Sequence, residues 1–66
     1  MSVPANSPSY RLNYEDAIKV WLLHWEGYFQ NRIAAIFDTN PGRVNEVLKE
    51  HKFVGSRLDA MKRKAA

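Results

Sequence analysis

Apolar side chains recur with a helical period between residues 14 and 25. Asn13 precedes this stretch as a candidate helix N-cap, and Gly27 follows it as a C-terminal stop. Residues spaced three or four apart lie on the same face of a helix. The pattern therefore predicts a first helix whose buried face consists of Tyr14, Ile18, Trp21, Leu22 and Trp25.

A second helix is expected between Gly27 and a turn at residues 38–40. The turn residues, Asp38-Thr39-Asn40, break the apolar period with side chains that favour turns. Ala34 is the expected point of close approach to a neighbouring helix. The expected buried stripe of this second helix consists of Phe29, Ile33, Ile36 and Phe37.

A third helix is predicted to begin after Asn40 and to end near His51. Asn40 is its candidate N-cap, and Pro41 occupies the first helical position, where a missing N–H costs nothing. Ser56 is the candidate cap of a short last helix that extends to Met61. The third helix is expected to turn three residues inward, Val44, Val47 and Leu48.

These elements predict an all-α fold, a compact bundle of three to four helices. The chain has 66 residues, which is enough for one domain. Residues 1–9 contain two prolines and no apolar period, so a flexible N-terminal tail is expected there. We place the helical domain at residues 10–61 and a basic C-terminal tail at residues 62–66.

The composition disfavours several classes of protein. The chain has no cysteine, which excludes disulfides and thiolate metal sites. No apolar run approaches the roughly 20 residues of a membrane span, and the first residues lack the features of a signal peptide. His24 and His51 have no partners at the spacing of a zinc site or a catalytic pair. We expect a soluble cytoplasmic protein with no enzymatic activity, no metal and no cofactor.

Positive charge is concentrated in the second half of the chain. Residues 31–66 carry eight basic and four acidic side chains, whereas residues 1–30 carry two basic and three acidic ones. An asymmetry of this kind favours a polyanionic partner. The charge alone is a weak indication, because many small soluble proteins are basic.

Residues 30–49, QNRIAAIFDTNPGRVNEVLK, carry a motif with fixed spacing. Gln30 opens it, an apolar residue and Ala stand at its fourth and fifth positions, and apolar residues stand at its eighth, fifteenth and eighteenth. This segment resembles the helix-turn-helix of bacterial and phage repressors. The residues that carry the resemblance are Gln30, Ile33, Ala34, Phe37, Val44 and Val47.

Two positions depart from that motif. Its ninth position is usually Gly, because the turn favours positive φ, and here it is Asp38. Aspartate tolerates the left-handed region better than most residues, so we expect the turn to survive with some strain. Its tenth position is usually Val or Ile and here it is Thr39.

The resemblance implies a transcriptional regulator, in particular a repressor, that binds double-stranded DNA in the nucleoid. In such proteins the third helix enters the major groove. Arg43 is suited to guanine and Asn45 to adenine. Glu46 either accepts from the amino group of cytosine or repels wrongly placed phosphates. A phosphate contact or an ion pair with Glu46 or Glu50 is the alternative for Arg43. The candidate base-reading residues are Asn40, Arg43, Asn45 and Glu46.

Phosphate contacts are expected from the start of the second helix and from basic residues beyond the third. The run Lys62 to Lys64 either joins these contacts or is simply a solvated end. The candidate phosphate-binding residues are Gln30, Asn31, Arg32, Lys49, Lys52 and Arg57.

The first helix has more large apolar residues than a three-helix core readily covers. Core packing accounts for most of them. The surplus, Leu23 with Trp25 or Tyr28, is a candidate contact of a homodimer that reads a palindrome.

Two other functions fit the same pattern. The first is a small protein-binding module, such as an anti-activator or an inhibitor, that reuses the helix-turn-helix shape. Its motivation is the pair Pro41-Gly42, which offers no side-chain hydrogen bond to bases, together with the aromatic first helix. The second is an accessory DNA-binding part of a recombination or packaging machine.

Overall fold

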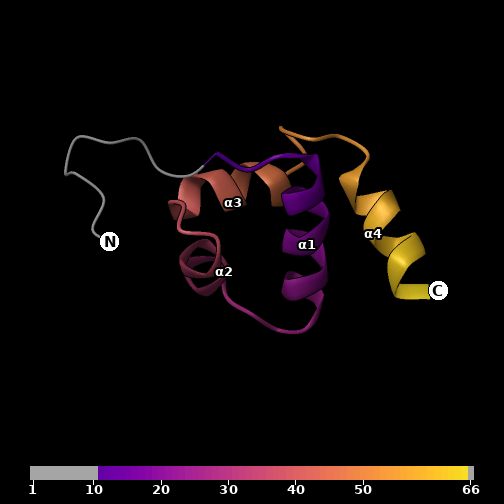
Figure 1. Ribbon diagram of the computed structural model, residues 1–66, viewed down its shortest axis with the longest axis horizontal. Coiled ribbons are helices and arrows are strands. Elements are labelled where there is room, and N and C mark those ends of the chain that lie inside the picture. The colour runs from indigo at the N-terminus through magenta and orange to yellow at the C-terminus, as the bar shows by residue number, and fades with distance from the viewer. Residues whose placement is uncertain (1–10, 66) are drawn as a thin grey trace.

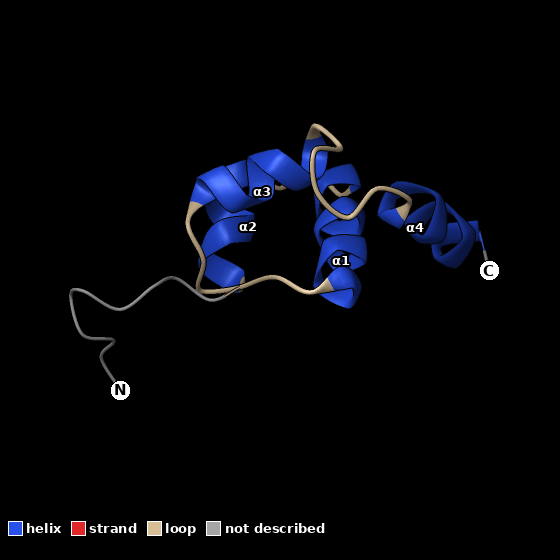
Figure 2. Ribbon diagram, turned by 90° about the horizontal axis from the view of Figure 1, so that it is seen from above, coloured by secondary structure: helices blue, strands red, loops and turns tan. Residues whose placement is uncertain are grey.

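The computed structural model of the chain describes residues 11–65. Its helices, in chain order, are α1 (Tyr14–Trp25), α2 (Gln30–Ile36), α3 (Pro41–Leu48) and α4 (Ser56–Ala65) (Figure 1). The part of the chain that the structure describes contains no strand, which confirms the all-α prediction (Figure 2). The tail predicted at residues 1–9 lies outside the described residues.

The helix α1 lies at the centre of the fold. Figures 1 and 2 both show α2 and α3 on one side of α1 and α4 on the other. Among the described helices, α4 packs against α1 alone, whereas α3 packs against both α1 and α2. The pair α2–α3 therefore forms a unit that α1 supports from behind, and α4 leaves that unit uncovered.

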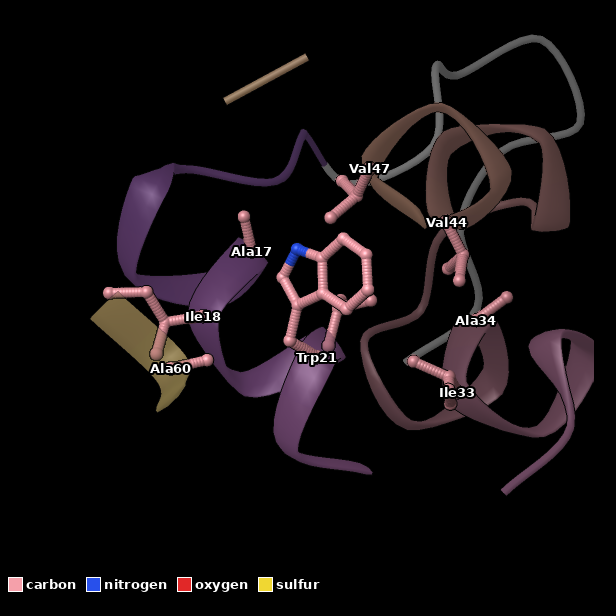
Figure 3. Close-up of a cluster of buried hydrophobic side chains, with 9 residues drawn as sticks. Ala17, Ile18, Trp21, Ile33, Ala34, Val44, Val47 and Ala60 are labelled. Carbon is pink, nitrogen blue, oxygen red and sulfur yellow. The ribbon is translucent and has the colours of Figure 1, made fainter. Parts of the chain in front are cut away.

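Trp21 connects the two sides of this arrangement (Figure 3). Its indole ring is buried between α1 and the apolar side chains of α2 and α3, and its Nε1 donates a hydrogen bond of 3.1 Å to the buried hydroxyl of Ser56 on α4. Burial of each large apolar side chain contributes about 1.5–3 kcal/mol. The buried core consists of Ala17, Ile18, Val20, Trp21, Ile33, Ala34, Val44, Val47 and Ala60.

The caps that begin and end α1 are those expected from the sequence. The side chain of Asn13 accepts a hydrogen bond of 2.8 Å from the N–H of Asp16, whose carboxylate accepts one of 3.1 Å from the N–H of Asn13. This reciprocal pair is a capping box. At the other end, Gly27 has φ 101°, a conformation that glycine adopts without steric cost.

Several predicted core positions are wrong. Phe29 and Ile36 are 78% and 55% exposed, and Tyr14 is 40% exposed. The seven residues of α2 contact their neighbours along one side only, and the stripe of Phe29 and Ile36 lies beside that contact. Conversely, Ala17 and Val20 are fully buried, because α1 is covered on two faces rather than one.

The last two helices differ from their predicted boundaries. The helix α3 ends at Leu48 rather than near His51, because Glu50 turns the chain with φ 60°. Ser56 is the first residue of α4, and its hydroxyl accepts from Trp21 rather than capping the helix. The helix also continues to Ala65, so the basic run Lys62 to Lys64 is its last turn and not a separate tail.

None of the helices in residues 11–65 has the length and apolar character that a membrane crossing requires.

Candidate nucleic-acid interface

The outer side of α3 faces away from the core of the fold. Val44 and Val47 are buried against α1 and α2, and Leu48 is half-buried beside them. The opposite side of the helix faces outward, and α4 lies on the far side of α1 (Figure 1). The exposed or half-buried residues of this outer face are Gly42, Arg43, Asn45, Glu46 and Lys49.

The turn between α2 and α3 is sharp, as the motif predicts. Asp38 adopts φ 55°, the left-handed conformation expected for it. Its N–H donates to the carbonyl of Ala35 at 3.2 Å, and the N–H of Thr39 donates to that of Ala34 at 2.9 Å. This pair of bonds is a Schellman motif with aspartate where glycine is usual. The two helices are thereby separate elements with a fixed angle between them.

Asn40 begins α3 as the expected N-cap. Its Oδ1 accepts a hydrogen bond of 3.1 Å from the N–H of Arg43, and Pro41 follows in the first turn. A Cβ at Gly42 would lie 3.1 Å from the same oxygen, so the missing side chain leaves room for the cap. The cap uses the Oδ1 of Asn40 as its acceptor, so the Nδ2 of Asn40 is the atom that can donate to a base.

A hydrogen bond links the start of α2 to the outer face of α3. The Nε2 of Gln30 donates to the Oδ1 of Asn45 at 3.4 Å. The structure thus brings together a residue predicted to contact phosphate and one predicted to read a base. Asn45 is half-buried, and Gln30 is exposed.

Arg43 forms the ion pair that the sequence left as an alternative. Its Nη1 lies 3.9 Å from the Oε1 of Glu46, and the two side chains are 46% and 40% exposed. An exposed pair at that separation contributes about 0–1 kcal/mol. A guanidinium held this weakly is available to a stronger acceptor.

On the side of α3 away from Gln30, basic residues from three segments line one pocket of about 280 Å³. Arg11 comes from the segment before α1, Arg43 from α3, and Lys52 from the connection between α3 and α4. Glu46, Leu12 and Phe53 complete the lining. Arg11 was missed at the sequence level, because only the tertiary fold brings it to α3.

Of the other predicted phosphate-binding residues, four lie on or next to α2 and α3, and one lies on α4. Gln30, Asn31 and Arg32 lie exposed on the first turn of α2, and Lys49 lies exposed at the end of α3. Arg57 does not join them, because it belongs to α4 and lines a separate hollow with Trp25, Met61 and Lys64.

The basic run at the end of α4 is engaged with α1. The guanidinium of Arg63 forms a bidentate ion pair with the carboxylate of Glu15. This contact holds the pKa of Glu15 below its ordinary value. The Nζ of Lys64 lies 5.6 Å from the centre of the Trp25 ring, which is the geometry of a cation–π contact.

The candidate dimer residues differ in their exposure. Leu23 and Trp25 are half-buried and pack against the core. Tyr28 is 41% exposed. Phe29, directly before α2, and Ile36, in α2, are exposed as well. Other exposed large apolar side chains lie in α1 (Tyr14) and on or just before α4 (Val54, Leu58 and Met61).

Within residues 11–65, no group of three or more metal-ligating side chains comes together. Comparison of the chain with protein-family models, with curated proteins and with solved structures finds no match.

Proposed function

We propose that the chain is a DNA-binding regulator of transcription that inserts α3 into the major groove of duplex DNA. The observation that carries this proposal is the geometry of α3. One side of the helix is buried through Val44 and Val47, and the other presents Arg43, Asn45 and Lys49 to solvent. The major groove is wide enough to admit a helix presented in this way.

Asn45 and Arg43 are the residues to which we assign base recognition. Arg43 offers a bidentate fork to guanine, and Asn45 offers an amide to adenine. The bond from Gln30 restrains Asn45 at the outer face before DNA arrives, whereas Arg43 is only weakly paired with Glu46 and is free to move to a base. The preorganisation of Asn45 lowers the entropic cost of binding.

Selection of bound sequences from a random duplex pool, followed by binding measurements on the selected duplex, tests the proposal. Arg43→Ala is expected to lose about 1–3 kcal/mol on the preferred sequence and much less on unrelated duplexes. Lys19→Ala is the matched control, since it removes the same charge from the exposed side of α1. Absence of any duplex binding at low salt contradicts the proposal, as does an equal loss in both variants.

We also propose self-association through α2, which would double the DNA footprint. The exposed residues Tyr28 and Phe29 line a shallow hollow together with an acid, Glu26, and a base, Arg32, and Ile36 is exposed on the same helix as Arg32. Two copies related by a twofold axis would place each Arg32 near the partner's Glu26. Sedimentation that shows only monomer at high micromolar concentration would contradict this part of the proposal.

The second candidate function is a protein-binding module, and the exposure of Phe29 and Ile36 is the observation that favours it. A foreign helix could cover this apolar surface as well as a second copy could. No duplex binding at low salt, together with loss of partner binding in Phe29→Glu, would support it against DNA binding.

A further inference from the structure

The pocket beside α3 is lined by more positive than negative side chains. Three cations, Arg11, Arg43 and Lys52, line it together with a single carboxylate, that of Glu46. Glu46 already pairs with Arg43, and neither Arg11 nor Lys52 forms an ion pair within the described part of the chain. Two positive charges therefore remain uncompensated around a volume of about 280 Å³.

The backbone holds Lys52 at this place. Phe53, the next residue, has φ 54°, which is rare for a bulky side chain and costs on the order of 1–3 kcal/mol. Its ring meets that of Tyr14 edge to face, with 6.4 Å between their centres, and is half-buried against the core. The connection from α3 to α4 is thus a fixed structure, and Lys52 is carried on it.

The pocket and Gln30 flank α3 on opposite sides. Gln30 bonds to Asn45, whereas the pocket is built on Arg43 and Glu46. On a helical wheel of α3, Asn45 lies at one edge of the outer face, and Arg43 and Glu46 lie toward the other edge. A helix in the major groove has a phosphate backbone on each side, so a contact at only one edge would leave its orientation free.

We infer that Arg11 and Lys52 form a phosphate-binding site beside Arg43, and that this site holds the DNA backbone on the side of α3 opposite to α2. The inference rests on the proposed function. Arg11 and Lys52 bind a phosphodiester through charge-assisted hydrogen bonds, and the apolar wall of Leu12 and Phe53 limits the water around it. A free phosphate has similar chemistry, and the experiment separates the two sources.

The salt dependence of binding measures this contact. Each neutralised phosphate contributes about 0.9 to the slope of log K against log salt concentration. Arg11→Ala and Lys52→Ala are each expected to lower that slope by about this amount on specific and non-specific duplexes alike, without changing the preferred sequence. Lys19→Ala is the control that should leave the slope unchanged, and the circular dichroism of each variant checks its fold.

Glu46→Gln tests the same site by removing a negative charge, whereas the other two variants each remove a positive one. Removal of the carboxylate from the pocket is expected to strengthen binding to every duplex several-fold. A loss confined to the preferred sequence would instead show that Glu46 reads a cytosine and would count against the site. A slope for Arg11→Ala equal to that of the intact protein overturns the inference and leaves the proposed function standing. Absence of duplex binding by the intact protein overturns both.

Free phosphate is the remaining alternative. A titration with inorganic phosphate at constant ionic strength, followed through the Nε resonance of Arg11, should show no saturation, whereas duplex DNA should saturate it. Saturation by inorganic phosphate with no response to duplex overturns the assignment to the DNA backbone.

Discussion

The amide of Gln30, the first residue of α2, donates a hydrogen bond to the amide oxygen of Asn45 on α3. The bond joins α2 to α3 at their exposed edge. The bond is long and exposed, so it favours one orientation of the Asn45 amide without locking it, and the amide oxygen has a second lone pair for a base.

Loss of this bond should affect base recognition rather than affinity alone. Asn45→Ala is expected to lose about 1–3 kcal/mol of discrimination at one adenine of the preferred sequence. Gln30→Ala should lose a smaller part of the discrimination at that same adenine, because Asn45 is left free to rotate. Competition between duplexes that differ at this base pair measures the effect. Uniform weakening across all duplexes in Gln30→Ala would mean that Gln30 contacts only phosphate.

The turn at Asp38 should be strained. Its φ of 55° lies in the left-handed region, which costs most residues roughly 1–2 kcal/mol. Asp38→Gly is therefore expected to be more stable to urea than Asp38→Ala by about 1 kcal/mol. A more stable alanine variant would contradict the observed turn, since alanine is favoured wherever φ is negative and helical.

The buried bond between Trp21 and Ser56 should stabilise the attachment of α4. Ser56→Ala leaves the buried indole N–H without an acceptor, which costs about 1–3 kcal/mol. Urea unfolding of this variant, of Trp21→Phe and of the double variant gives the coupling between the two residues, expected to be about 0.5–3 kcal/mol. Additive losses would show that the bond is not formed in solution.

Acid should weaken the contact between α1 and α4. The ion pair with Arg63 lowers the pKa of Glu15 from its ordinary value of 4.5, so Glu15 binds a proton less readily in the folded state than in the unfolded one. Its contribution to stability is therefore present above pH 4.5 and is lost as the pH falls through the folded-state pKa.

Thermal unfolding between neutral pH and about pH 3 compares the intact chain with Glu15→Gln. The intact chain should be the more stable at neutral pH, and the difference should shrink as the pH falls through this window. A constant difference over the whole range would mean that the pair does not contribute.

The local features of the fold could be predicted from the sequence. Asn13, Gly27 and Asn40 have the roles that their side chains favour, and the left-handed turn at Asp38 follows from the motif. Such features depend on interactions within a few residues, and the sequence shows these directly.

The features that the sequence did not predict depend on tertiary packing. Phe29 and Ile36 have the spacing of a buried stripe, yet a helix as short as α2 is covered on one side only. The ion pair of Glu15 with Arg63 joins residues 48 positions apart, and the pocket joins Arg11 to Lys52. No local pattern signals contacts of this range, so the residues on the outer face of α3 could be predicted while the approach of Arg11 to them could not.

The account depends on the outer face of α3 meeting DNA, and a nuclear magnetic resonance titration of the ¹⁵N-labelled chain with its selected duplex tests that most directly. The largest amide shifts are expected in residues 40–52 and at Gln30 to Arg32, with little change along the outer side of α4. Shifts concentrated on α4, or none at all at low salt, would contradict the account.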